Sequence, residues 1–121
     1  MYAAAGGTGL GVYQAAADAG KYAIGVDSNQ NHLHPGTMLT SMVKMVGAAA
    51  RESWTEEMNG RWKPGIKVLG LKENAINWSL DQYNKSLISE QLKAYMATLK
   101  QDIISGKIKV HDYMSDNTCK Y

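Results

Sequence analysis

Two stretches of this 121-residue chain contain residues with the chemistry to bind an oxygen-rich ligand. In the first, four glycines follow a run of alanines within six positions, at Gly6, Gly7, Gly9 and Gly11. In the second, Asp27 ends the apolar run Ala23–Val26. Backbone N–H groups of a glycine turn that opens a helix bind ligand oxygens, and a carboxylate accepts hydrogen bonds from two neighbouring sugar hydroxyls. The two stretches predict a hydroxyl- or phosphate-binding crevice.

Each of these residues also has a simpler interpretation. The glycines could serve only to permit a turn, and Asp27 could cap a following helix or pair with a lysine. The spacing Gly7-x-Gly9-x-Gly11 lacks the two residues that separate the last glycines of the dinucleotide-binding fingerprint. Asp27 nevertheless lies about 20 residues beyond the turn, as the acidic ribose ligand of that motif does. A fragment of an NAD- or nucleotide-binding enzyme is therefore the alternative hypothesis.

Other polar residues give weaker signals. Lys44 interrupts an apolar run. It could be a solvated lysine on the polar face of a helix, or a partly buried ammonium that requires a partner. The amides of residues 29–31 could contact a ligand or simply form a turn. His32 and His34 have no carboxylate or thiol in ligand register, so we predict no metal site. We find no nucleophile–base set and no paired carboxylates at the turn, and we predict neither catalysis nor a cofactor.

Composition indicates one small globular domain, with 45% hydrophobic residues, 20% charged residues and a formal net charge of +2. The basic residues are scattered singly, which argues against nucleic acid as a partner. The single cysteine, Cys119, has no internal disulfide partner. No apolar run approaches the ~20 residues of a membrane span, and no signal peptide is evident at the start. The chain begins as if within a strand, so we expect a piece of a longer protein.

The elements that position these residues begin with a βαβ unit. We predict a strand over 2–5, a helix over 9–19 with Gly20 at its end, and a strand over 22–27. The apolar face of this helix is predicted to comprise Val12, Ala15, Ala16 and Ala19. A loop follows over 28–37, and then a helix over 40–58 that Thr40 or Ser41 caps and Gly60 closes.

The remaining residues add strands and one further helix. We predict a strand over 67–71, an edge strand over 75–80, and a helix over 89–105 between Ser89 as its cap and Gly106 as its stop. A last strand over 108–110 precedes a flexible tail over 111–121. Strands alternating with helices predict an α/β fold, a three-layer sandwich built on a parallel sheet.

Four stretches of this chain occur in the order found in a known family. Residues 3–11, 23–31, 39–44 and 103–110, with 69–74 between the last two, resemble the C-terminal portion of the basic membrane protein (BMP) family. These proteins are substrate-binding lipoproteins of ABC transporters, similar to the bacterial purine nucleoside receptor. The resemblance covers essentially the whole chain.

The resemblance implies a fold and a ligand. The fold would be part of a Rossmann-like, type I periplasmic-binding-protein fold, with residues 1–121 as its C-terminal portion and the N-terminal lobe absent. A purine nucleoside such as guanosine, inosine or adenosine would bind between the lobes. By resemblance, Gly6 and Gly7 contact the ribose side, Asp27 takes the ribose hydroxyls, and Lys44 reaches the ligand from the hinge-proximal helix.

The same resemblance implies a setting for the protein. The full-length protein would be a lipoprotein anchored outside the cytoplasm, at the cell membrane or in the periplasm, and would deliver its ligand to an ABC permease. The signal sequence and the lipidated cysteine are not part of this chain. With the first lobe missing, we expect half a binding site, weak nucleoside affinity, and self-association through apolar surface that the other lobe would cover.

Overall fold

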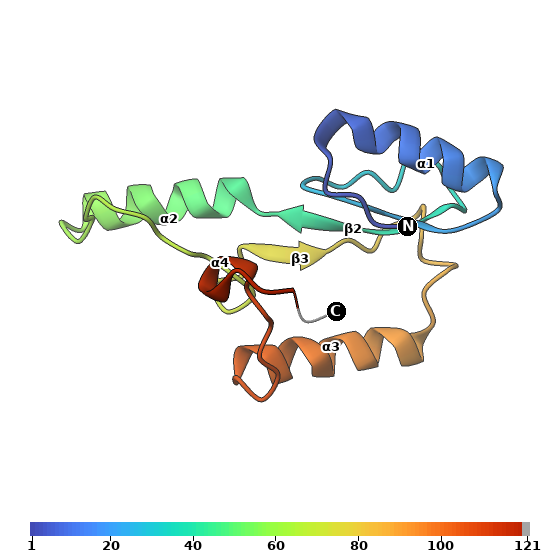
Figure 1. Ribbon diagram of the computed structural model, residues 1–121. Coiled ribbons are helices and arrows are strands. Elements are labelled where there is room, and N and C mark those ends of the chain that lie inside the picture. Colours follow the sequence, from blue (N-terminus) through green and yellow to red (C-terminus); the bar gives the residue numbers. More distant parts are fainter. Residues whose placement is uncertain (120–121) are drawn as a thin grey trace.

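The fold is organised around a small mixed β-sheet. The computed structural model describes residues 1–119, and its strands are β1 (Ala23–Gly25), β2 (Met38–Lys44) and β3 (Ile76–Trp78), in that spatial order. Strands β1 and β2 are parallel, whereas β3 pairs antiparallel with β2 (Figure 1). Tyr2 extends the sheet beyond β1 through a single parallel bridge to Ile24. The predicted strand over 2–5 is thus reduced to one bridge.

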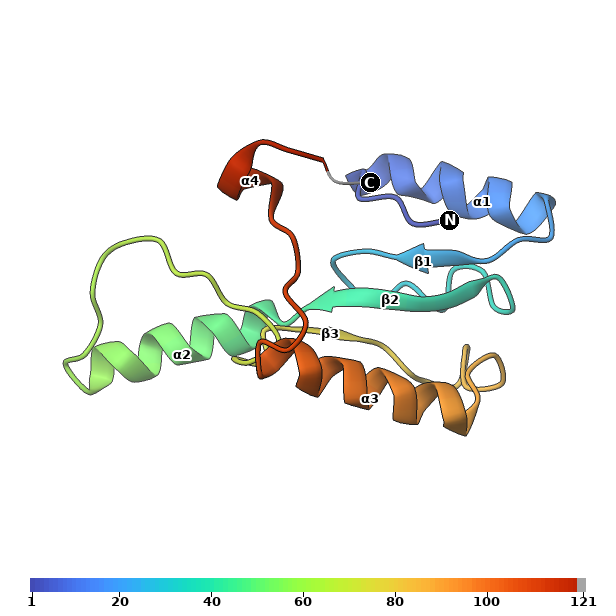
Figure 2. The ribbon, with the colours of Figure 1, turned by 60° about the horizontal axis from the view of Figure 1, so that its bottom comes forward.

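Helices lie on both sides of this sheet. Helix α1 (Gly9–Asp18) follows the short helix η1 (Gly6–Thr8) and lies on one side, and α3 (Glu90–Ile104) lies on the other (Figures 1 and 2). This arrangement confirms the predicted three-layer α/β fold. The prediction of a parallel sheet was wrong for its last strand. The chain turns back after β2, and β3 pairs antiparallel with the edge of β2.

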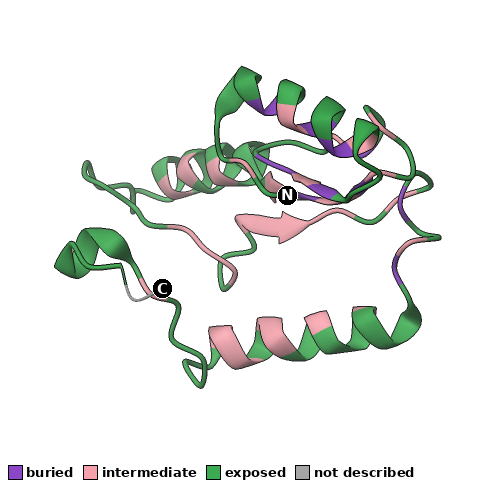
Figure 3. Cartoon of the chain, turned by 45° about the vertical axis from the view of Figure 1, so that its right-hand side comes forward, coloured by how far each residue is buried: buried purple, intermediate pink, exposed green. Residues whose placement is uncertain are grey.

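The buried core is small and lies between α1 and the first two strands. Tyr13 and Ala16 pack with Ala23 and Met38, and all four are at most 1% exposed (Figure 3). Most of the predicted apolar face of this helix was wrong: of its four residues only Ala16 is buried, Val12 is half-buried, and Ala15 and Ala19 are exposed. The larger Tyr13 ring fills the space above the sheet and turns the helix toward it.

The ends of the first and last long helices match their sequence signals. Gly20 follows α1 with φ +61°, and Gly106 follows α3 with φ +78°. Ser89 is the N-cap of α3, where its hydroxyl accepts a hydrogen bond from the Leu92 N–H at 3.1 Å. These two helices therefore follow directly from local capping chemistry.

The helix predicted over 40–58 was wrong in its first part. Residues up to Lys44 form β2, and α2 (Val46–Met58) begins only at Val46. Thr40 caps no helix, because its hydroxyl donates to the Ser79 carbonyl at 2.7 Å within the sheet region. The spacing of the methionines fits a helix but also fits a strand, and pairing with a strand on each side favours the strand.

Two other predicted strands do not form in the described chain. Residues 67–71 and 108–110 are irregular, and Val68 and Val110 are largely exposed. Neither segment pairs with a strand among the described residues, so strand propensity alone does not produce a strand. Within the predicted tail, Tyr113–Asp116 form a single helical turn, α4, which the Asp112 side chain caps at the Met114 N–H. Residues 120–121 of that tail lie outside the described residues.

Candidate functional site

Two of the predicted site residues meet at the carboxyl ends of the parallel strands. Lys44 is the last residue of β2, so its predicted place on a helix was wrong, and Asp27 follows β1 by two positions. The Lys44 ammonium lies 2.7 Å from the Asp27 carboxylate, and the Lys44 backbone N–H donates to the Asp27 carbonyl at 2.9 Å. Both side chains are more than half exposed, at 57% and 53%. The pair therefore lies open to solvent at the sheet edge where α/β proteins bind ligands.

Asp27 has an unusual backbone conformation. Its φ is +70°, in the left-handed region that non-glycine residues rarely adopt, although Asp and Asn tolerate it best. The buried Val26 precedes it, and the Ser28 N–H donates to the Val26 carbonyl at 2.9 Å. These contacts and the Lys44 N–H hold the strained residue in place, so its carboxylate has a defined position before any ligand arrives.

The Asp27 carboxylate stabilises the charged form of Lys44. The hydrogen bond and the negative charge of Asp27 raise the pKa of Lys44 above its ordinary value, and the Tyr2 phenol adds a smaller effect. The ammonium therefore stays charged at neutral pH. The lysine pairing left open as the simpler interpretation of Asp27 is thus present in the ligand-free chain. Tyr2, an aromatic residue ahead of the alanine run, was not among the predicted site residues.

The glycine turn lies where the chain leaves the Tyr2 bridge. Gly6 has φ +55°, a backbone conformation that favours glycine, whereas a Cβ on Gly7 would meet no atom within 4 Å. Both residues are exposed, and Thr8, at the start of α1, makes no side-chain capping bond. Since the Tyr2 bridge is parallel to β1, the turn follows the same end of the sheet as Asp27 and Lys44. Its role as a ligand contact stays a prediction.

A buried polar network supports the loop after Asp27. Asn31, Ser41 and Asn84 are fully buried. The Ser41 hydroxyl donates to the Asn31 side-chain oxygen at 2.8 Å and accepts from the Gln30 N–H at 3.0 Å. The Asn84 amide donates to the carbonyls of Leu39 and Ser79. Ser41 thus fixes the loop to β2, and Asn84 ties β2 to the segment after β3.

Asp81 connects this loop to the segment that follows β3, at the other edge of the sheet. Its carboxylate accepts hydrogen bonds from Asn29 at 2.7 Å, from Asn31 at 3.1 Å and from the Tyr83 N–H at 2.8 Å. These bonds, with Asn29 the largest contributor, hold the pKa of Asp81 below its ordinary value. The amides of Asn29 and Asn31 thus bind the protein itself, in agreement with the structural interpretation of this loop. No sequence signal pointed to Asp81.

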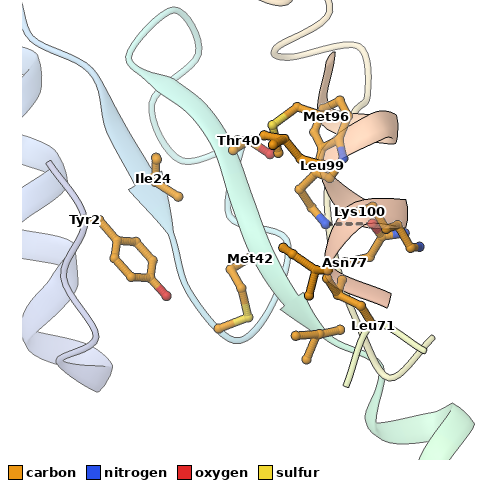
Figure 4. Close-up of a pocket in the computed structure, with 12 residues that line it drawn as sticks. Tyr2, Ile24, Thr40, Met42, Leu71, Asn77, Met96, Leu99 and Lys100 are labelled. Atoms are coloured by element: carbon orange, nitrogen blue, oxygen red, sulfur yellow. Dashed lines mark hydrogen bonds between the residues drawn. The ribbon is translucent and has the colours of Figure 1, made fainter. Parts of the chain in front are cut away.

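A separate apolar groove of about 400 Å³ lies between the sheet and α3. Ile24 and Met42 line it from the sheet, and Met96 and Leu99 line it from the helix (Figure 4). The Lys100 ammonium donates to the Asn74 side-chain oxygen at 3.4 Å. Ligand sites combine apolar walls with convergent polar groups, and this groove has few of them. The Asp27–Lys44 edge is the stronger candidate for a polar ligand.

Two further features bear on the class of site. Within residues 1–119, no three His, Cys, Asp or Glu side chains gather as a metal ion would require. The His32 ring instead lies at a tilt to Tyr83, with 6.3 Å between ring centroids. None of the helices described is long and apolar enough to cross a membrane.

Comparisons with known proteins agree with one another. The sequence profile described as "ABC transporter substrate-binding protein PnrA-like" matches residues 1–113. Basic membrane protein C of Borreliella burgdorferi is 35% identical over 116 residues, which are 93% of this chain and 32% of that protein. An uncharacterized lipoprotein of Pyrococcus abyssi is 36% identical over 88 residues, 67% of this chain and 22% of that one. The chain thus spans about a third or less of these relatives.

A solved structure supports the same likeness at the level of the fold. An ABC transporter solute-binding protein from Aeropyrum pernix K1 superposes with a TM-score of 0.70 and 26% identity, covering 91% of this chain and 39% of that one.

Proposed function

The chain belongs to the PnrA-like family of ABC transporter substrate-binding proteins, and we propose that it supplies part of a purine nucleoside site. The observation that carries this proposal is the Asp27–Lys44 pair at the open carboxyl edge of two parallel strands. An exposed carboxylate held in place by an ion pair is suited to a ligand with two adjacent hydroxyl groups, as a ribose has.

Each residue of the site has a distinct task in this proposal. The two oxygens of Asp27 accept hydrogen bonds from the 2′- and 3′-hydroxyls of the ribose. Lys44 orients that carboxylate through their ion pair, and it donates to a ligand oxygen with a proton that Asp27 does not use. Backbone N–H groups at Gly6 and Gly7, in η1 just before α1, bind the ribose side. Guanosine, inosine and adenosine all present this ribose.

The proposed activity is binding and release without chemical change. In the full-length protein the ligand passes to an ABC permease, and the protein is anchored outside the cytoplasm as a lipoprotein. The printed name of the Pyrococcus abyssi relative, a lipoprotein, supports this placement. The chain alone holds part of a site, while the full cost of immobilising the ligand remains. We therefore expect millimolar or weaker affinity, about −4 kcal/mol or less in magnitude.

Amide chemical shifts in two-dimensional NMR provide a test at this affinity. Adenosine, guanosine and inosine are titrated into the ¹⁵N-labelled chain, and saturable shifts are expected at Gly6, Gly7 and Lys44. The Asp27→Asn variant keeps the size of the side chain and tolerates the left-handed backbone, and it should weaken binding at least tenfold. The matched control is Asp18→Asn, an exposed carboxylate at the far end of α1, which should bind like the parent.

Two comparison ligands separate the proposed mode from others. Loss of the 2′- and 3′-hydroxyls in 2′,3′-dideoxyadenosine should weaken binding as much as Asp27→Asn does. Equal binding of adenosine and its dideoxy analogue would contradict ribose recognition by Asp27. Preferential binding of NAD would instead favour the dinucleotide-enzyme alternative.

A further inference from the structure

Gln30 lies in the loop after Asp27, where its amide could contact a ligand or serve the turn itself. In the structure its side chain reaches back along the chain, and Nε2 donates to the Val26 carbonyl at 2.8 Å. The same carbonyl accepts from the Ser28 N–H at 2.9 Å. Gln30 is therefore bonded to the residue that directly precedes Asp27.

The turn at Asp27 is of a rare kind. The Ser28 N–H bonds to the carbonyl two residues earlier, and Asp27 between them has φ +70°. These are the features of a γ-turn in its strained form. A conformation of this kind persists only where the surrounding structure holds it. The turn therefore requires restraints from outside its own three residues.

Gln30 is placed to supply such a restraint. Its backbone N–H donates to the Ser41 hydroxyl at 3.0 Å, which fixes it to β2, while its side chain bonds to Val26 at the end of β1. Gly25 leaves room for that side chain, because a Cβ on Gly25 would lie 3.1 Å from the Gln30 Cβ. One residue thus ties the Asp27 turn to both parallel strands.

The other atom of the same amide indicates that this position is not optimised for stability alone. The Gln30 Oε1 is buried and has no hydrogen-bond partner among the residues that the structure describes. The Val26 carbonyl cannot donate a hydrogen bond, so turning the amide over would leave both oxygens unpaired. Buried polar atoms are nearly always paired, and an unpaired one lowers stability. Departures of this kind are expected where a residue serves a functional site.

We propose that Gln30 is a positioning residue of the ligand site, whose side-chain amide holds Asp27 in the turn that presents its carboxylate. Its donor bonds to Val26 and its acceptor is buried, so Gln30 acts through Asp27 and not on the ligand itself. The ligand that the carboxylate binds rests on the proposed function. The hold on Asp27 exists in the ligand-free chain and can be measured there.

Two NMR observables report this hold. The three-bond coupling between the amide and Hα protons of Asp27 depends on its φ, and hydrogen exchange of the Lys44 amide reports its bond to the Asp27 carbonyl. Gln30→Met keeps the length of the side chain and removes the donor. We expect the Asp27 coupling to move away from the value of the parent and the Lys44 amide to exchange about fivefold faster.

Global stability separates positioning from a merely structural role. Gln30→Met also removes the unpaired Oε1, so the midpoint of urea unfolding should stay unchanged while Asp27 loosens. Gln14→Met is the matched control, because Gln14 is an exposed glutamine on α1 whose amide donates to Asp18. That variant should leave the Asp27 coupling and the Lys44 exchange at the values of the parent.

A second variant and a second ligand complete the test. Gln30→Glu has the shape of glutamine and replaces the donor with an oxygen, so it should move the Asp27 coupling without leaving a packing defect. Both Gln30 variants should weaken adenosine binding about fivefold. They should leave 2′,3′-dideoxyadenosine unaffected, because it lacks the hydroxyls that Asp27 accepts from.

The outcomes for Gln30 and for the nucleoside site are distinguishable. An Asp27 coupling that neither variant changes overturns the proposal, as does unweakened adenosine binding in a variant whose coupling has moved. A parent that binds none of the nucleosides refutes the proposed function instead. In that case the coupling measured without ligand still decides whether Gln30 holds Asp27.

Discussion

Gly25→Ala should damage the fold directly beneath the candidate site. Gly25 ends β1, two residues before Asp27, and lies against β2. A Cβ at this position would meet the Ser41 hydroxyl at 2.5 Å, the Ser41 Cβ at 3.0 Å and the Gln30 Cβ at 3.1 Å. The first of these distances is shorter than real Cβ contacts, so Ser41 or the strand must move.

The size of the effect follows from what that movement breaks. Overpacking a filled interior costs about 1–3 kcal/mol. Displacing the buried Ser41 hydroxyl also disrupts its hydrogen bonds to Asn31 and Gln30, at about 1–3 kcal/mol for a buried group left unpaired. The lower entropy of the unfolded alanine variant returns about 0.4–1 kcal/mol. We expect the free energy of unfolding to fall by about 2–4 kcal/mol.

Urea unfolding followed by circular dichroism measures this change, at concentrations where the parent is in one oligomeric state. Gly11→Ala is the matched control, because no atom lies within 4 Å of its Cβ position in α1. That variant should gain about 0.5–1 kcal/mol from helix propensity.

A double-mutant cycle with Ser41→Ala tests the mechanism behind this prediction. Both single changes break the same hydrogen bonds, so their costs should fall short of additive by about 1 kcal/mol or more. A Gly25→Ala variant within about 0.5 kcal/mol of the parent would refute the packing argument, and full additivity would refute the shared network.

Three further predictions concern other parts of the fold. Ser89→Ala removes the cap on the Leu92 N–H and should lower the free energy of unfolding by about 1 kcal/mol in urea, whereas Ser89→Asp should preserve it. The bonds from Asn29 hold the pKa of Asp81 below 3.8, so their stabilisation is complete above that pH and is lost as pH falls through the folded-state pKa; Asp81→Asn should flatten this acid dependence of urea unfolding. The buried Tyr13 hydroxyl has no hydrogen-bond partner among the described residues, so Tyr13→Phe should leave the melting temperature unchanged or slightly higher, and a clear loss would reveal a partner.

The parts that were predictable from sequence are those with a local cause. Helix α1 ends at a glycine with positive φ, and α3 begins at a serine that caps its first turn. The βαβ order then brings the end of β1 and the glycine turn to one edge of the sheet. That Asp27 pairs with another polar group was also predictable, because a carboxylate that ends a buried strand must find a partner.

The parts that were missed depend on neighbours distant in sequence. Residues 38–44 carry apolar side chains at spacings that fit both a helix and a strand, and only pairing with β1 and β3 decides for the strand. Val68 lies in a segment with strand propensity but no adjacent strand, and it stays irregular. Asp81 is some 50 residues from the two amides that it accepts from, so no local pattern reveals that contact.

This division explains how a chain about a third the length of its relatives can hold the proposed ligand edge in place. The loop after Asp27 is fixed by β2, through Ser41, and by the segment around Asp81, all of which belong to this chain. Asp27 is thus held in its strained conformation without contributions from elsewhere. The apolar groove between the sheet and α3, by contrast, stays open among the residues that the structure describes. The structure therefore combines a preorganised edge, which we propose as the ligand site, with an open apolar groove beside α3.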